Sequence, residues 1–197
     1  MNGDLSPLIG VVLAGGRSQR MGTDKASLLY HDRPQTDWTV ALLTPYCKEV
    51  FGLFKYPPSD FSLPFMTDDP RFGDNGPIAG ILTVMDHYPK TPLLVVGCDY
   101  PLLDPETIEI LLNGRSNAHI CTSFRSPTDG RPEPLIAIYE KECFSALNDY
   151  HRNGNYSLRK FLENNSTHLL DAPDASKLES YDTPEQAQRL LKKEPDA

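Results

Sequence analysis

The sequence has few cysteines and no pattern typical of a zinc site. Its 197 residues include four cysteines, Cys47, Cys98, Cys121 and Cys143, and none of them forms a C-x-x-C pair. The five histidines form no H-x-x-x-H pair. A zinc site is therefore not expected. Scattered cysteines of this kind are typical of buried thiols in a reducing compartment, so we expect a cytoplasmic protein.

Basic clusters and long apolar runs are also missing. The chain has 19 Lys and Arg against 27 Asp and Glu, a formal net charge of −8, and no block of basic residues. This balance argues against nucleic acid or an anionic membrane as a partner. The apolar run 8–13 is far shorter than the roughly 18 residues that a membrane span needs, and the N-terminus lacks the basic start of a signal peptide. We expect a soluble protein. If it binds a phosphate, a few nearby residues must make the contacts, because the chain as a whole is acidic.

The order of apolar segments predicts one α/β domain over residues 1–197. A chain of this length buries about 70% of its unfolded surface and needs no disulfide or metal to fold. Short apolar runs alternate with longer amphipathic stretches, which is typical of a mainly parallel sheet with helices on both faces. The expected strands are 8–13, 49–54, 93–97, 119–123, 135–139 and 168–170. The expected helices are 36–44, 77–87, 105–112, 141–150, 157–163 and 184–192, and the Pro- and Ser-rich segment 56–64 is expected to be a loop.

A glycine-rich loop follows the first expected strand. Its sequence from Leu13 to Gly22 is L-A-G-G-R-S-Q-R-M-G. Adjacent glycines let backbone N–H groups approach a phosphate, and Arg17, Arg20 and Lys25 add three cations to an acidic chain. The spacing differs from both G-x-x-x-x-G-K-[ST] and G-x-G-x-x-G, which argues against a P-loop and a dinucleotide-binding motif. A glycine pair alone is equally compatible with a tight turn beside solvated cations.

Two aspartates follow apolar or extended segments farther along the chain. Asp99 comes directly after the run 93–97, where open α/β sheets bind ligands, and a carboxylate there is a candidate ligand for Mg²⁺ beside phosphates. The simpler interpretation is that Asp99 caps the turn before Pro101. Asp69 precedes Gly76 in the element D-D-P-R-F-G-D-N-G-P-I-A-G, and it is either a nucleotide contact or part of an ordinary Asp-Pro turn.

The loop motif resembles the opening signature of the molybdenum cofactor guanylyltransferases, L-A-G-G-x-S-x-R-M-G-x-D-K. This resemblance implies a Rossmann-like nucleotide-diphospho-sugar-transferase type fold. In that family the loop backbone holds the nucleotide and the lysine contacts phosphate. The positions that would bind nucleotide here are Leu13, Ala14, Gly15, Gly16, Lys25, Asp69 and Asp99, and those that would act in catalysis are Lys25, Asp99 and Arg20.

Later segments extend the resemblance over nearly the whole chain. The family has C-D-x-P-x-[LI] at the strand carrying Asp99 and uses that aspartate for magnesium, so Mg²⁺ is the implied cofactor. It also has an aspartate before G-P-L-A-G, which matches Asp69 by its distance from Gly76. The segments R-P-E-P-L-I-A-I-Y from Arg131 and G-N-Y-S-L-R from Gly154 resemble the family's elements beside the acceptor pocket.

Two positions depart from the family pattern. The late motif is usually N-x-N-T-P-E, with both asparagines near the pterin substrate, whereas this chain has Ser180 and Asp182 in those places. The family also often has an asparagine near the end of the second strand that contacts the nucleotide, and the segment 52–55 contains none. The acceptor and the choice of base therefore stay open at this stage.

The resemblance implies transfer of GMP from GTP to the phosphate of molybdopterin, with release of pyrophosphate. No general base is expected, because a phosphate nucleophile is already ionised at neutral pH. One alternative is a related nucleotidyltransferase that uses CTP, another triphosphate or a sugar or alditol phosphate, although the loop argues against it. Another is a non-catalytic nucleotide-binding protein. The expected partners are GTP, molybdopterin or another phosphorylated acceptor, and, transiently, other proteins of cofactor biosynthesis.

Overall fold

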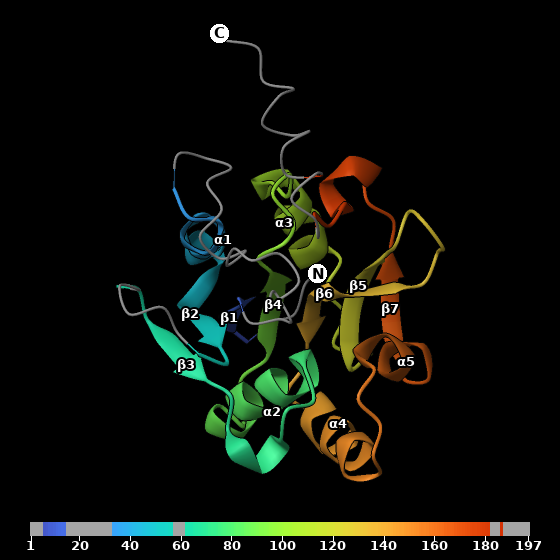
Figure 1. Ribbon diagram of the computed structural model, residues 1–197. Helices are drawn as coiled ribbons and strands as arrows, with labels where there is room; N and C mark the ends of the chain where they lie inside the picture. Colours follow the sequence, from blue (N-terminus) through green and yellow to red (C-terminus); the bar gives the residue numbers. More distant parts are fainter. Residues whose placement is uncertain (1–5, 15–32, 57–61, 182–185, 187–197) are drawn as a thin grey trace, which may run out of the picture.

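A single seven-stranded sheet organises the protein. In the computed structural model, the described residues are 6–14, 33–56, 62–181 and Gln186. The strand order in the sheet is β3-β2-β1-β4-β6-β5-β7 (Figure 1). The strands are β1 Leu8–Leu13, β2 Cys47–Phe54, β3 Phe65–Thr67, β4 Leu93–Gly97, β5 Cys121–Arg125, β6 Pro132–Tyr139 and β7 Thr167–Leu170.

The strands run mainly parallel, as expected from the sequence. β6 is antiparallel to its neighbours β4 and β5, and the other pairings among these strands are parallel. β1 lies between β2 and β4 and is completely buried. Ile9, Val11 and Leu13 pack on one face of the sheet, whereas Leu8 and Val12 pack on the other. Burial on both faces explains why β1 is a continuous apolar run rather than an alternating one.

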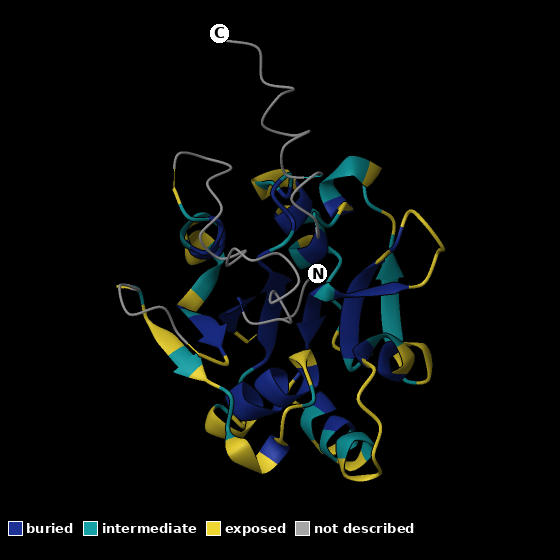
Figure 2. Ribbon diagram, viewed as in Figure 1, coloured by how far each residue is buried: buried dark blue, intermediate teal, exposed yellow. Residues whose placement is uncertain are grey.

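Helices cover both faces of the sheet, as expected. The buried residues of α2 Pro77–His87, α4 Cys143–Arg152 and α5 Leu158–Glu163 belong to one core cluster, and those of α1 Gln35–Leu43 and α3 Pro105–Asn113 belong to the other. Figure 2 shows the buried residues concentrated in the strands and on the helices against them. The described residues also form short 3-10 helices, η3 Thr44–Tyr46, η4 Pro70–Phe72 and η5 Ala175–Leu178. Within the described residues, no helix combines the length and apolar character that crossing a membrane requires.

Most element boundaries agree with the sequence, and the differences have local causes. β1, β4 and α2 have the expected bounds. β5 begins two residues late because the N–H of His119 closes a turn onto the carbonyl of Ser116 at 3.2 Å. α4 is shifted to Cys143–Arg152. β3 was not predicted, because three residues are too few to show a periodic pattern. This segment is recognised as a strand through its pairing with β2. Of the expected helix 184–192, Gln186 alone lies within the described residues.

Candidate active site

The order of the strands reverses direction between β1 and β4. From β1 the chain goes outward to β2 and β3 on one side, then returns to β4 on the other side. Open α/β sheets bind ligands at such a reversal of strand order. The two strand ends are joined there: Leu13 pairs with Gly97, and the N–H of Cys98 donates to the carbonyl of Leu13 at 3.1 Å. The glycine-rich loop and Asp99 therefore start from adjacent points of one edge.

Leu13 and Ala14 are the described part of the glycine-rich loop. Both side chains are buried, and the N–H of Ala14 donates to the carbonyl of Leu53 at the end of β2, at 3.0 Å. The loop thus leaves β1 at a position anchored to β2 and β4. The other loop residues assigned from sequence, Gly15, Gly16, Arg20 and Lys25, lie outside the described residues.

Asp99 is partly exposed and lies two residues after the end of β4. Its carboxylate lies over Gly97, where a Cβ would come within 2.5 Å of Asp99 Oδ1 and 3.1 Å of Tyr100 Cε2. A larger residue at position 97 would therefore displace the Asp99 carboxylate from this place. The backbone carbonyl of Asp99 also accepts a hydrogen bond from the N–H of Tyr181 at 2.8 Å. This contact brings the start of the late motif to the same edge.

The pair Asp68 and Asp69 has two separate roles in the structure. Asp69 caps η4 by accepting a hydrogen bond from the N–H of Arg71 at 2.8 Å, and its Oδ2 also pairs with the Arg71 guanidinium at 2.7 Å. These bonds to Arg71 lower the pKa of Asp69. Asp68 instead follows β3 and points at α2, since a Cβ on Gly80 would lie 3.0 Å from its Oδ1. Burial raises the pKa of Asp68.

Asp68 is a second candidate in this region, one that the sequence analysis did not single out. The spacing to Gly76 favoured Asp69, but the geometry favours Asp68 as the carboxylate that can face a ligand at the sheet edge. The signal was present in the sequence: an aspartate directly after a short extended segment repeats the arrangement of Asp99 after β4. Because the strand Phe65–Thr67 was not predicted, this parallel was not visible.

Gly76 and Gly80 shape the start of α2 beside Asp68. Gly76 precedes the helix with a φ of 72°, a left-handed conformation that favours glycine, and nothing lies within 4 Å of a Cβ built there. Gly80 is different, because a Cβ would lie 2.3 Å from Leu53 Cδ2. The absence of a side chain at Gly80 thus allows α2 to pack closely against the end of β2.

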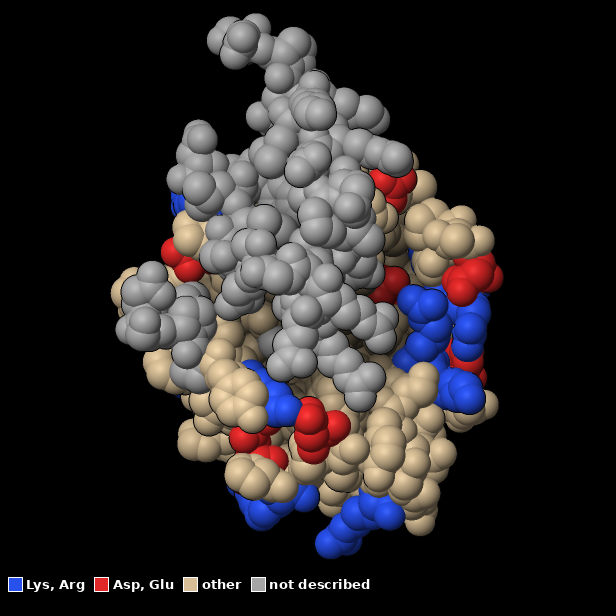
Figure 3. Space-filling view, in the orientation of Figure 1, with Lys and Arg blue, Asp and Glu red and all other residues tan. Residues whose placement is uncertain are grey.

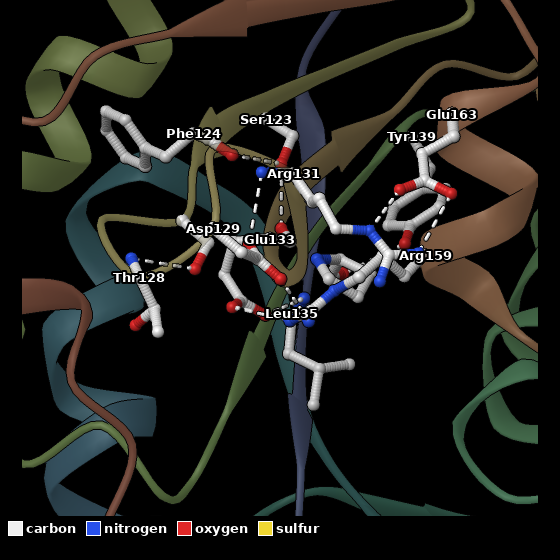
Figure 4. A network of polar contacts seen from close by, with 12 residues as sticks. Ser123, Phe124, Thr128, Asp129, Arg131, Glu133, Leu135, Tyr139, Arg159 and Glu163 are labelled. Carbon is white, nitrogen blue, oxygen red and sulfur yellow. Dashed lines mark hydrogen bonds and ion pairs between the residues drawn. The ribbon is translucent and has the colours of Figure 1, made fainter.

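On the other side of Asp99, β6 and α5 contribute a buried carboxylate and an arginine. Glu133 of β6 accepts a hydrogen bond from Nη2 of Arg159 at 3.3 Å, and Arg159 Nη1 also lies 3.6 Å from Asp129 (Figure 4). Tyr100, next to Asp99, is buried on this side of the edge. Burial raises the pKa of Tyr100 well above its usual value, and the negative charges of Asp99 and Glu133 add to this rise. The two segments noted in the sequence around Arg131 and Gly154 are thus joined through Glu133 and Arg159.

Charges of both signs are intermixed around α5. Arg131 pairs with Glu163, and Arg125 pairs with Asp171 at 3.3 Å. Figure 3 shows basic and acidic side chains next to each other on this part of the surface. Because these charges are paired, the described part of this region has no surface patch of purely positive or purely negative side chains. A phosphate would therefore be recognised through local contacts rather than general attraction.

A magnesium ion fits the donor set at this edge. Among the described residues, no three His, Cys, Asp or Glu side chains gather in a group that would hold a metal. Mg²⁺ typically takes one or two carboxylates and completes its shell with substrate phosphates and water. Asp99 is a carboxylate of this type, partly exposed and lying over Gly97 at the end of β4.

The chain is similar to curated proteins of molybdenum cofactor biosynthesis. It is 28% identical to a molybdenum cofactor biosynthesis bifunctional protein from Synechocystis, over 91% of this chain and 52% of that protein. This chain therefore spans about half the length of that relative. It is also 29% identical to a probable molybdenum cofactor guanylyltransferase from Halalkalibacterium halodurans, over 71% of this chain and 73% of that protein. A third relative, with the same description, from Geobacillus is 26% identical over 86% of this chain and 89% of that protein.

The fold is also found in solved structures. Molybdopterin-guanine dinucleotide biosynthesis protein A from Archaeoglobus fulgidus superposes with a TM-score of 0.77 at 20% identity, covering 94% of this chain and 97% of that one. A 2-C-methyl-D-erythritol 4-phosphate cytidylyltransferase from Thermus thermophilus superposes with a TM-score of 0.67 at 14% identity, covering 94% and 97%. At these identities the likeness shows the nucleotidyltransferase type of fold expected from the sequence. The MobA-like NTP transferase domain matches residues 10–170, and the chain therefore belongs to this family.

Proposed function

We propose that this protein transfers GMP from GTP to the phosphate of molybdopterin and releases pyrophosphate. The observation that carries the proposal is the junction of β1 and β4, where the Cys98 N–H donates a 3.1 Å hydrogen bond to the Leu13 carbonyl and so joins the strand before the glycine-rich loop to the strand before Asp99. A triphosphate needs both elements, because loop amides bind phosphate and a carboxylate holds the divalent cation. The relatives described as molybdenum cofactor guanylyltransferases support molybdopterin as acceptor.

Different residues would contact different parts of the nucleotide. Leu13, Ala14, Gly15 and Gly16 would supply backbone contacts to the nucleotide, and Lys25 and Arg20 would contact its phosphates. Asp99 would hold Mg²⁺, which when bound offsets negative charge on the phosphates. Two aspartates are candidates for contacting the nucleoside. Asp69 is favoured by its distance from Gly76 in the sequence, and Asp68 is favoured by its position at the sheet edge beside Gly80.

The reaction needs little covalent chemistry from the protein. An oxygen of the acceptor phosphate forms a bond to the α-phosphorus of GTP, and the bond from that phosphorus to the α,β-bridging oxygen breaks. The electron pair of this bond leaves with pyrophosphate. Lys25 and the loop amides would stabilise the charge that grows on the leaving group. An ionised acceptor phosphate needs no base, so positioning and charge are the protein's contributions.

A second candidate is transfer from CTP to a sugar or alditol phosphate. The observations in its favour are Ser180 and Asp182, which stand where the family has asparagines near the pterin. The glycine pair Gly15-Gly16 argues against it, because the loops of such enzymes commonly read Ala-Ala-Gly. In either case we propose that the protein works in the cytoplasm and contacts other proteins of the pathway transiently.

Pyrophosphate release distinguishes these functions. Each of the four nucleoside triphosphates is combined with molybdopterin or with a sugar phosphate, at fixed Mg²⁺. Release that requires GTP and molybdopterin together is expected, and release with CTP and a sugar phosphate would refute the proposal. No release with any pair would favour a non-catalytic nucleotide-binding protein.

Lys25→Ala tests the loop directly. The variant should weaken GTP binding about tenfold while keeping the wild-type melting temperature, because a charged hydrogen bond to phosphate is lost. Lys48→Ala is the matched control, since Lys48 lies on an exposed position near the start of β2, at the opposite end of that strand from the site. Equal GTP affinity in both variants would remove Lys25 from the phosphate site.

A further inference from the structure

A lysine and an aspartate from separate elements meet at the ligand edge of the sheet. Lys55 directly follows β2, and its Nζ lies 2.5 Å from Oδ2 of Asp74, in the loop between η4 and α2. The two side chains are exposed, by 42% and 75% respectively. Exposed ion pairs of this kind contribute little to stability, so the fold does not depend on this one. The pair presents a hydrogen-bond donor and an acceptor side by side at this edge.

Backbone contacts place Lys55 next to the start of the glycine-rich loop. The N–H of Ala14 donates to the carbonyl of Leu53, two residues before Lys55, at 3.0 Å. Because β1 lies between β2 and β4, Lys55 and Asp99 follow the two strands that flank β1. Neighbouring strands are about 4.8 Å apart, so the ends of β2 and β4 are separated by roughly 10 Å. A nucleotide with its phosphates between the loop and Asp99 would therefore extend its base towards Lys55.

The loop that carries Asp74 is held in a defined conformation by its neighbours. Gly73 has a φ of 66°, a left-handed conformation that turns the chain just before Asp74. On the other side, Nδ2 of Asn75 donates to the carbonyl of Phe72 at 2.8 Å and lies 3.0 Å from Nε2 of His151. The exposed carboxylate is thus carried by a loop that is fixed to α4, which suits a group that recognises a ligand.

We propose that Asp74 and Lys55 recognise the Watson–Crick edge of guanine and thereby select GTP as the donor. Along this edge guanine presents an acceptor, O6, followed by two donors, N1–H and the N2 amino group. A carboxylate accepts from both donors, and an ammonium has three N–H groups, so Lys55 can donate to O6 while it stays paired with Asp74. The inference rests on the proposed function in that the nucleotide lies on the glycine-rich loop, and it adds how the base is chosen.

The same pair of side chains disfavours other ligands. Adenine and cytosine have a ring nitrogen with a lone pair at the centre of this edge, which the Asp74 carboxylate repels. Uracil has an N–H there, but a carbonyl stands where guanine has its N2 amino group. A site built to hydrogen-bond one group strongly rejects a substrate that lacks it. A phosphate would also be repelled by Asp74, so the pair fits an uncharged base better than the triphosphate.

Nucleotide binding to the full chain tests the inference without turnover. Isothermal titration gives the affinities for GTP and CTP, for ITP, whose base lacks the N2 amino group, and for XTP, whose base has a carbonyl in place of that group. The wild-type protein should bind GTP about tenfold more tightly than ITP, because a hydrogen bond from the amino group to a carboxylate is lost.

Asp74→Asn should change the preferred base rather than only weaken binding. An amide has one acceptor and one donor group, which match the N1–H and the adjacent carbonyl of xanthine. We expect the affinity for GTP to fall about tenfold and the affinity for XTP to rise about tenfold relative to wild type. Lys55→Ala should weaken GTP and ITP equally, because both bases have O6. A purely structural role of the pair would not raise the affinity for XTP.

Matched controls remove the same charges elsewhere on the surface. Asp86→Asn changes the aspartate of another exposed ion pair, with Arg71 at 2.6 Å. Lys48→Ala removes an exposed lysine near the opposite end of β2. Both controls should keep the wild-type affinities for all four nucleotides, and all variants should keep the wild-type melting temperature. If the controls change the preferred base as much as the test variants do, the inference is wrong.

The outcomes separate this inference from the proposed function. A wild-type preference for GTP that persists unchanged in Asp74→Asn and Lys55→Ala would refute the inference alone. A wild-type preference for CTP over GTP would refute GTP as the donor and the inference with it. Selective GTP binding that depends on Asp74, without transfer to molybdopterin, would refute the proposed reaction and support the inference.

Discussion

The backbone N–H of Tyr181 donates a hydrogen bond of 2.8 Å to the carbonyl of Asp99. The two residues are far apart in the sequence, yet this bond fixes the start of the late motif at the end of β4. A second contact supports the same placement, since Lys177 of η5 pairs with Asp104, the cap of α3, at 2.9 Å. A hydrogen bond and an ion pair therefore hold the proposed cation ligand, Asp99, close to the start of the proposed acceptor segment.

Asp182 follows Tyr181 in the chain and lies outside the described residues, and its charge should affect the acceptor rather than GTP. We expect Asp182→Asn to leave GTP affinity near wild type and to improve binding of a phosphorylated pterin about fivefold to tenfold. The reason is repulsion between a carboxylate and a phosphate, about 1 kcal/mol at about 4 Å in water and more in a drier pocket. Titration of the acceptor at fixed GTP, at low and high salt, measures the effect.

The control for Asp182 is an aspartate with the same change of charge outside the site. Asp171 is exposed and pairs with Arg125, so Asp171→Asn should leave acceptor affinity unchanged. Equal acceptor affinity in wild type and Asp182→Asn would place Asp182 outside the acceptor pocket and would remove this departure as an argument against molybdopterin.

The two neighbouring aspartates before α2 should respond differently to the same substitution. Asp68→Asn should weaken GTP binding about tenfold, because the Asp68 carboxylate lies at the sheet edge against Gly80. Asp69→Asn should instead lower the melting temperature slightly, because it weakens the cap on η4 and the pair with Arg71. Isothermal titration with GTP and thermal unfolding of both variants check this. A larger loss of GTP affinity in Asp69→Asn would restore the assignment made from spacing.

Gly80→Ala should destabilise the protein although alanine favours helices. The intrinsic gain of alanine over glycine in a helix is about 1 kcal/mol. Against it, the new Cβ would lie 2.3 Å from Leu53 Cδ2 in a closely packed core, and such overpacking costs about 1–3 kcal/mol. Urea unfolding measures the sum, which we expect to be a net loss.

Adding Leu53→Ala to Gly80→Ala identifies the cause of that loss. The smaller side chain makes room for the Cβ, so the double variant should be more stable than the sum of the two single changes predicts. Strict additivity would show that the Gly80 side of α2 is not in close contact with β2, contrary to the structure.

The Cys47 thiol should make stability depend on pH in the alkaline range. Burial raises its pKa from 9.0 to about 12. The folded protein therefore keeps this proton where the unfolded chain releases it, so the associated stability is complete below pH 9 and is lost as the pH rises toward 12. Cys47→Ser has no ionisable thiol at this position, and its unfolding free energy should fall less steeply with pH over that window. Parallel slopes for the two proteins would contradict the raised pKa.

The sequence by itself determined the elements whose residues are strongly patterned. Leu8–Leu13 and Leu93–Gly97 are apolar runs because both faces of the central sheet are covered. Pro77–His87 begins at a proline that follows Gly76, a common helix start. The local motifs also predicted a ligand site at one edge of the sheet, since the glycine-rich loop and Asp99 each follow one of these strands.

Only the tertiary structure decided how the site's residues are paired. Glu133 and Arg159 are separated by 26 positions, and nothing in the local pattern of either segment specifies the other. The strand Phe65–Thr67 exists only through its pairing with β2, and with it the separate orientations of Asp68 and Asp69. Periodicity reports which face of an element is buried, but contacts between distant segments depend on the strand order and register that the folded chain adopts.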